Sequence, residues 1–247
     1  MLQNDTAWML LFILLPLAAF FYASVGHGGA SSYLMLLALF HFDPLQIRPA
    51  ALILNMIVSG FAFITFRKTC SFQNRIFWSL ALFSIPAAFL GGTMFVDAVL
   101  YKKILGILLL FPVARFLNLF SVSEGVKLKR KIWMAPLLGA GIGFLSGLIG
   151  IGGGIILAPV LLITGWASIR ETAAMSALFI FLNSTAGLLG SGTLGVTIST
   201  ELWLLMPGTV VAGMLGAWNG AFRFNVKTLK YLLTSVLLFA SVKLLFT

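Results

Sequence analysis

The stretch Ser24-Val25-Gly26-His27-Gly28-Gly29-Ala30-Ser31-Ser32 interrupts a run of apolar sequence in the first half of the chain. The stretch Gly147-Leu148-Ile149-Gly150-Ile151-Gly152-Gly153-Gly154 does the same in the second half. Glycine costs up to ~1 kcal/mol per position in a helix interior, so each cluster predicts that one helix ends and another begins. In a bilayer such a break is tolerated only where protein or a water-filled cavity surrounds it. We therefore predict that the two breaks form the working site.

Composition indicates an integral membrane protein. Of the 247 residues, 60% are hydrophobic and only 9% are charged, whereas soluble domains carry about 25% charge. The apolar runs are continuous and do not alternate, which favours helices over a barrel. The net charge of +10 falls mainly in short connectors, as it does in cytoplasmic loops. The predicted partner is therefore the lipid bilayer, and no nucleic-acid partner is expected.

Ten apolar segments follow one another along the chain. In the first half they span Ala7–Val25, Ala30–Phe40, Pro49–Phe66, Ile76–Val96 and Ile104–Phe120. In the second half they span Ile132–Ile149, Ile155–Trp166, Ala173–Gly190, Leu202–Phe222 and Leu229–Phe246. Most are long enough to cross a hydrocarbon core of ~30 Å. The short segment after each glycine break reaches only ~17 Å, which predicts a half-helix or a re-entrant element.

The two halves match each other. Trp8 and Trp133, Trp78 and Trp203, and the two glycine clusters are separated by 124 or 125 residues. We predict a first repeat at residues 1–120, a cytoplasmic linker at 121–131 and a second repeat at 132–247.

The basic residues predict how the repeats lie in the membrane. They cluster after the third segment, in the linker and before the last segment, and we place these three loops in the cytoplasm. Five segments in each half then put the repeats in opposite orientations. The predicted fold is thus an all-α polytopic membrane protein of two inverted repeats, each with a broken or re-entrant helix. This architecture is typical of secondary transporters, with the substrate site near the midplane.

The acidic residues argue against a cation carrier. All six lie at segment ends or in connectors, where helix capping or solvation is the expected role: Asp5, Asp43, Asp97, Glu124, Glu171 and Glu201. An anion or a neutral solute is therefore the more plausible substrate.

Backbone donors could hold an anion, because a helix that begins after glycines points unpaired N–H groups into the gap. The candidate substrate-binding residues of this kind are Gly26, Gly28, Gly29, Ser31, Gly150, Gly152, Gly153 and Gly154. On this hypothesis Gly153→Val should stop transport and leave folding largely intact. Tight helix packing is the alternative role for glycine, and it is the one we predict for Gly141, Gly143 and Gly147.

Three further side chains are candidates for substrate binding. His27 could hydrogen-bond the ligand or carry a proton, and a purely structural hydrogen bond is the alternative. Asn55 and Asn183 each lie in the third segment of their half. A buried amide needs a partner, which is either the ligand or a neighbouring helix.

The breaks also carry a family resemblance. Gly150-Ile151-Gly152-Gly153-Gly154 followed by Ile155-Ile156-Leu157-Ala158-Pro159, together with Gly26-His27-Gly28-Gly29 and the repeat, resembles the sulfite exporter TauE/SafE family over nearly the whole chain. In the first copy Ala30 stands in place of the third glycine, and Met35 stands where the second copy has Pro159. The resemblance implies a multi-pass permease, mainly bacterial and hence of the inner membrane, for sulfite, organosulfonates or other small sulfur-containing anions.

The leading hypothesis is a secondary transporter of a small anion that works by alternating access. The alternative is a channel or carrier for another small solute or a cation. An enzyme is not expected, because the chain lacks a His-Glu-x-x-His zinc motif and a Gly-x-Ser-x-Gly elbow. It also lacks a phosphate-binding loop, and we expect no metal or cofactor. A homodimer and proton coupling remain open alternatives.

Overall fold

The computed structural model describes residues 5–94, 132–195 and 198–223, and the single residues 100, 103, 107 and 225. Its helices are α1 (Asp5–Ala23), α2 (Ala30–Leu39), α3 (Pro44–Arg67), α4 (Asn74–Thr93), α6 (Ala135–Ile149), α7 (Gly154–Ile163), α8 (Ile169–Gly192) and α9 (Thr200–Phe222). A 3-10 turn at Ile132–Met134 precedes α6. These ranges contain no strand. The predicted segments Ile104–Phe120 and Leu229–Phe246 and the linker 121–131 lie outside the described residues.

Two helices, α3 and α8, begin four or five residues earlier than the apolar pattern predicts, because polar residues cap them. Helix α3 begins at Pro44, where the Asp43 side chain accepts a hydrogen bond from the Leu45 N–H at 3.0 Å. Helix α8 begins at Ile169, where Ser168 and Glu171 form a capping box. Such caps satisfy backbone donors that the first turn leaves unpaired. The capping role predicted for Asp43 and Glu171 is confirmed.

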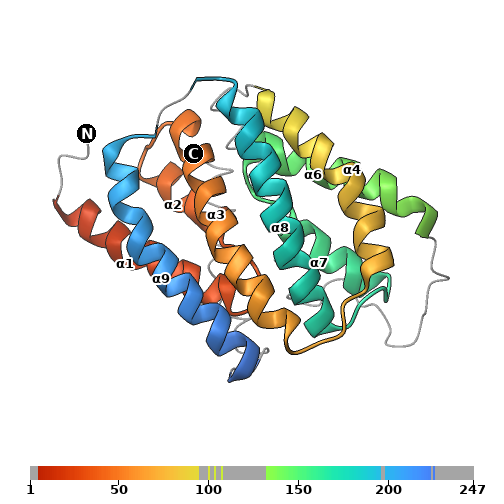
Figure 1. The fold of residues 1–247 in the computed structure, drawn as a ribbon. Coiled ribbons are helices and arrows are strands. Elements are labelled where there is room, and N and C mark those ends of the chain that lie inside the picture. The colour runs from red at the N-terminus through yellow and green to blue at the C-terminus, as the bar shows by residue number, and fades with distance from the viewer. Residues whose placement is uncertain are drawn as a thin grey trace.

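The centre of the molecule is the pair α3 and α8, which pack side by side and run in opposite directions (Figure 1). Around this pair, α4 packs on α6 and on α8, while α9 packs on α1 and on α3. The short helix α2 packs on α3, and α7 packs on α8. If α1, α2, α3 and α4 are matched in order with α6, α7, α8 and α9, each of these contacts has a counterpart. The contact of α4 with α6 corresponds to that of α9 with α1, for example.

Glycines bring the outer helices together. On α6, a Cβ added to Gly143 or Gly147 would collide with the backbone of α4, so the predicted packing role of these two is confirmed. On α9, Gly216 approaches the backbone of α1 in the same way, and Gly220 approaches the backbone of Ser24, the residue after α1. The prediction for Gly141 is wrong, because nothing lies within 4 Å of a Cβ at that position. Small residues allow this close approach in membrane helices.

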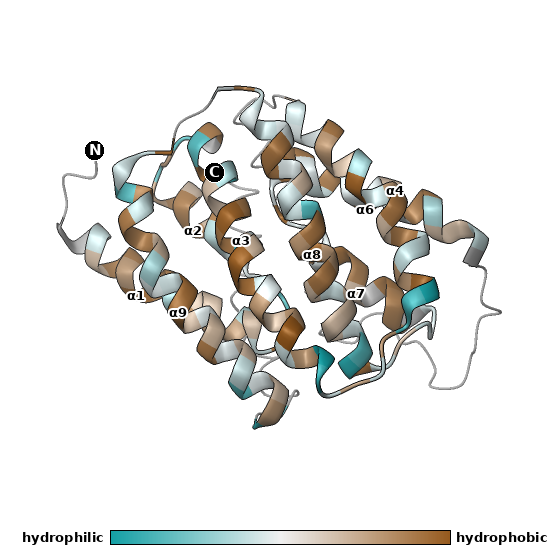
Figure 2. Cartoon of the chain, viewed as in Figure 1, coloured by the Kyte–Doolittle hydropathy of each residue, from teal (hydrophilic) through white to brown (hydrophobic). Residues whose placement is uncertain are grey.

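The outer surface is apolar along the helices. Hydrophilic residues concentrate at the ends, most visibly where α3 meets the connection to α4 and where α8 begins (Figure 2). Four described helices are long and apolar enough to cross a membrane, namely Leu45–Arg67, Asn74–Thr93, Ile169–Gly192 and Thr200–Phe222. Helices α2 and α7 have 10 residues each, or ~15 Å of length, so neither crosses a bilayer core.

Candidate functional site

Both glycine clusters are helix breaks, as predicted, and they are built alike. Helix α1 ends before Gly26, whose φ is +80°, and the His27 N–H then donates to the Tyr22 carbonyl at 3.0 Å. This is the hydrogen bond with which a left-handed glycine closes a helix. Gly29, at φ +97°, precedes α2. In the second break Gly150, at φ +88°, closes α6, and Gly153, at φ +76°, precedes α7.

One side chain joins the two breaks. Asn55 of α3 accepts a hydrogen bond from the Ala30 N–H, the first of α2, at 3.0 Å. Its Nδ2 donates to the Ile151 carbonyl in the second break at 3.2 Å and to the Ser184 hydroxyl at 3.4 Å. The Asn55 side chain is 1% exposed, so its amide relies on these partners. The Asn55 amide therefore fills the space where the two breaks meet.

Glycine is needed where the breaks touch this amide. A Cβ at Gly28 would collide with the Asn55 Oδ1, and a Cβ at Gly152 would lie 2.5 Å from its Nδ2. On the opposing helix α8, Ile180 packs its methyl groups against Gly152 and Gly154. Asn55 and Ile180 lie 125 residues apart, the spacing of the repeat. The two halves thus contribute an amide and a branched alkyl group at matching positions.

His27 reaches from the first break to the second. Its ring is 7% exposed, and its Nδ1 lies 3.1 Å from the Val25 carbonyl. The backbone of Gly154, at the start of α7, lies beside the same ring. His27 therefore packs between the end of one break and the helix that follows the other.

Other candidate residues face elsewhere. Asn183 donates to the Phe179 carbonyl of its own helix at 2.8 Å and accepts from the Ser84 hydroxyl of α4. Its partners are therefore helix groups and not residues of the glycine breaks. Ser31 lies beside the Tyr22 hydroxyl. Gly26 packs against Ala173.

The structure corrects the expectation for Gly153→Val. A Cβ at this left-handed position would lie 3.0 Å from both Ile142 and Phe179, within the core between α6 and α8. A branched side chain there strains the backbone and overpacks the core. The substitution would therefore disturb folding, and it cannot isolate a role in transport.

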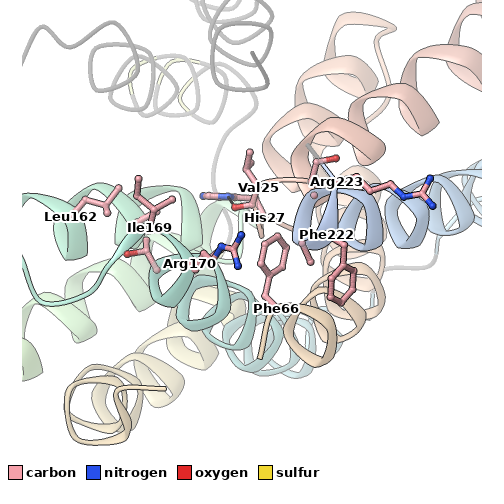
Figure 3. A pocket seen from close by; sticks show the side chains of 14 residues that line it. Val25, His27, Phe66, Leu162, Ile169, Arg170, Phe222 and Arg223 are labelled. Atoms are coloured by element: carbon pink, nitrogen blue, oxygen red, sulfur yellow. Dashed lines mark hydrogen bonds between the residues drawn. The ribbon is translucent and has the colours of Figure 1, made fainter. Parts of the chain in front are cut away.

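A cavity of about 300 Å³ lies on one side of the first break. Val25 and His27 of the break line it, together with the end of α3, part of α7, the first turn of α8 and the end of α9 (Figure 3). Two arginines, Arg170 and Arg223, belong to the lining, and none of the 14 lining residues is acidic. The sequence did not single out Arg170 or Thr172, because no local pattern places the start of α8 beside the first glycine break.

The described residues contain no group of three His, Cys, Asp or Glu side chains that could hold a metal ion. The polar groups around the breaks are an amide, a histidine ring, hydroxyls and backbone groups, while guanidinium groups line the cavity. This set can donate hydrogen bonds to a bound solute and offers no carboxylate to bind a cation.

Comparison with known proteins identifies relatives of this chain. The family described as sulfite exporter TauE/SafE matches residues 11–244. A probable membrane transporter protein of Sinorhizobium fredii is 33% identical over 245 residues, covering 98% of this chain and 99% of the relative. A probable membrane transporter protein of Methanocaldococcus jannaschii is 28% identical over 135 residues, covering 53% of this chain and 49% of the relative. No solved structure matches the chain. The chain is a multi-pass membrane transporter that belongs to the sulfite exporter TauE/SafE family.

Proposed function

We propose that the protein is a secondary transporter of a small anion, such as sulfite, a sulfonate or another sulfur-containing anion. The anion binds between the two glycine breaks, and alternating access moves it across the membrane. The observation that carries the proposal is the Asn55 amide, which contacts both breaks at once.

The inverted repeats are part of the proposal, with residues 1–120 as the first and 132–247 as the second. The antiparallel pair α3 and α8 and the matched contacts of the helices around it support this symmetry. Two similar halves of opposite orientation give two conformations of similar energy, each open to one side of the membrane.

The Asn55 amide links binding to this motion. Its bond to the Ala30 N–H lies within the first half, whereas its bond to the Ile151 carbonyl crosses to the second half. A movement of one half against the other breaks the second bond. An anion placed between the breaks then accepts hydrogen bonds from the freed Nδ2 and from backbone N–H groups of the breaks. Anion binding thereby offsets the loss of the Ile151 contact.

The test is flux through the purified protein in proteoliposomes. We expect uptake of labelled sulfite by the wild type and a reduction of about tenfold or more in Asn55→Ala, because one donor to a buried anion is lost. Asn219→Ala is the matched control, since among the described residues the Asn219 amide bonds only to the Leu215 carbonyl of its own helix. Wild-type flux of cations, with no flux of sulfite, sulfonates or other small anions, contradicts the proposal and favours the cation carrier.

Proton coupling through His27 extends the proposal. A pH gradient across the liposome should drive sulfite accumulation in the wild type, and His27→Gln should abolish the accumulation but retain downhill exchange. Equal accumulation in His27→Gln would assign His27 a structural role.

A further inference from the structure

The cavity beside the first break has a positively charged wall that the glycine breaks do not explain. Arg170 and Arg223 both line it, but they behave differently. The Arg223 guanidinium lies 4.9 Å from the centre of the Trp218 ring, which holds it by a cation–π contact. The Arg170 guanidinium extends toward His27 and Phe66 (Figure 3). Among the described residues it has no hydrogen-bond or ion-pair partner.

A second, independent observation points to a ligand. Thr172 lines the same cavity and is 3% exposed, and its Oγ1 has no hydrogen-bond partner among the described residues. Leaving a buried hydroxyl unpaired costs about 1–3 kcal/mol. A ligand oxygen in the cavity would satisfy this hydroxyl and the Arg170 guanidinium together.

The neighbouring acid forms no ion pair with this wall among the described residues. The Glu171 carboxylate accepts hydrogen bonds from Ser71, Gln73 and the Ser168 N–H, on the side of the connection between α3 and α4. Glu171 is not among the cavity's lining residues. Arg170 and Thr172, on the first turn of α8, therefore face the cavity with the positive end of the helix dipole.

We infer that this cavity is a separate binding site for a small soluble oxyanion, with Arg170 and Thr172 as its ligands. The inference rests on the proposed function, because it assigns the cavity as the access site through which the anion reaches the breaks. A volume of about 300 Å³ equals that of about ten water molecules. It accommodates an oxyanion with part of its hydration shell or with a short apolar group.

His27, a residue of the first break, forms part of the boundary of this site. Its ring lines the cavity, and its other neighbour is the backbone of Gly154 at the start of α7. On this inference, an anion that leaves Arg170 for the Asn55 amide passes the His27 ring. The site is thus reached from the side of the membrane on which α3 ends and α8 begins.

Binding is tested on the full-length protein in phosphatidylcholine nanodiscs, by calorimetric titration with methanesulfonate and with sulfate. We expect Arg170→Gln to weaken binding by about tenfold or more. Arg170→Lys should retain most of the affinity at low salt and lose it as salt rises. Thr172→Val should weaken binding by a few-fold. Arg75→Gln is the matched control, since Arg75 is exposed and outside the cavity.

The results separate this inference from the proposed function. One outcome is that the wild type transports sulfite while Arg170→Gln and Thr172→Val keep the wild-type affinity for methanesulfonate and the wild-type KM for sulfite. In that case the assignment of the cavity as a binding site is wrong and the proposed function stands. If anion binding depends on Arg170 but the wild type moves no anion, the proposed function fails and the site remains. Should Arg170→Gln not fold, Arg170→Lys and Thr172→Val carry the test.

The phosphate group of an anionic lipid is the other oxyanion that Arg170 and Thr172 could hold. Titrations are therefore repeated in nanodiscs that contain phosphatidylglycerol. Unchanged affinity for methanesulfonate supports a soluble ligand. Loss of that affinity overturns the assignment to a soluble oxyanion, because an anionic headgroup then occupies the cavity.

Discussion

At the scale of single residues, Asn55 and Ile180 show how the two halves differ where the glycine breaks meet. They lie at matching positions of α3 and α8, and both contact glycines of the breaks. Only Asn55 can donate and accept hydrogen bonds, so all the amide chemistry comes from the first half. In the sequence, Asn55 stands out only as a buried amide in need of a partner. Its three partners lie 25, 96 and 129 residues away, and no local pattern identifies contacts at that distance.

Gly28 tests this contact with a double-mutant cycle. A Cβ at Gly28 collides with the Asn55 Oδ1, so Gly28→Ala should displace the amide and lower stability by about 1–3 kcal/mol. Combined with Asn55→Ala, which removes the obstructing atoms, the cost of Gly28→Ala should largely disappear. Stability is measured by thermal unfolding in detergent, followed by tryptophan fluorescence.

Gly141→Ala is the control for this cycle, because nothing lies within 4 Å of a Cβ there. It should leave the melting temperature unchanged or raise it slightly. Equal destabilisation by Gly28→Ala in the presence and absence of the Asn55 side chain would show that the amide is not the obstacle.

At the scale of elements, Arg48 ties the start of α3 to the end of α4. Its Nη1 donates to the Met94 carbonyl at 2.8 Å, and its Nη2 donates to the Gly91 and Gly92 carbonyls. The last carbonyls of a helix have no partner within the helix and carry a partial negative charge. A buried guanidinium at this place therefore caps α4. Arg48 also packs against Gly150, so the same side chain supports the second break.

Loss of this cap should destabilise the fold. We expect Arg48→Gln to lower the free energy of unfolding by about 2 kcal/mol or more, since charged hydrogen bonds to buried carbonyls are lost. Arg48→Lys should recover only part of this, because lysine cannot span several carbonyls with a planar fork. Denaturant unfolding in mixed micelles measures the change. An effect of Arg48→Gln no larger than that of the exposed control Arg75→Gln would contradict the capping role.

At the scale of the whole molecule, the apolar pattern predicted the described helices and both breaks. Both signals can be read from a short stretch of sequence, because an apolar run must match the bilayer thickness and glycine disfavours a helix interior. Helix starts shifted where side-chain caps acted, as at Asp43 and Ser168. The cavity could not be predicted, because Phe66, Arg170 and Arg223 come from three different helix ends. Their meeting depends on how α3, α8 and α9 pack.

The orientation of the molecule in the membrane is a prediction that one native side chain can test. Cys70 is the single cysteine of the chain and lies in the connection between α3 and α4. The positive-inside rule places this connection in the cytoplasm, beside Arg67, Lys68 and Arg75. A membrane-impermeant maleimide should therefore label Cys70 in inside-out vesicles and spare it in right-side-out vesicles. The reverse result would invert the topology and place the Arg170 cavity on the outer side.

The pH dependence of this labelling tests the local structure as well. Burial raises the pKa of the Cys70 thiol, Glu171 raises it further, and Arg67 and Arg170 lower it. Only the thiolate reacts with maleimide, so the labelling rate should keep rising with pH beyond the range of an ordinary thiol. Glu171→Gln removes a negative charge, lowers this pKa and should speed labelling at neutral pH. Cys70 belongs to the connection that precedes α4, whereas Glu171 lies in the first turn of α8. If Glu171→Gln leaves the rate unchanged at every pH, this connection and the start of α8 do not approach each other as the structure requires.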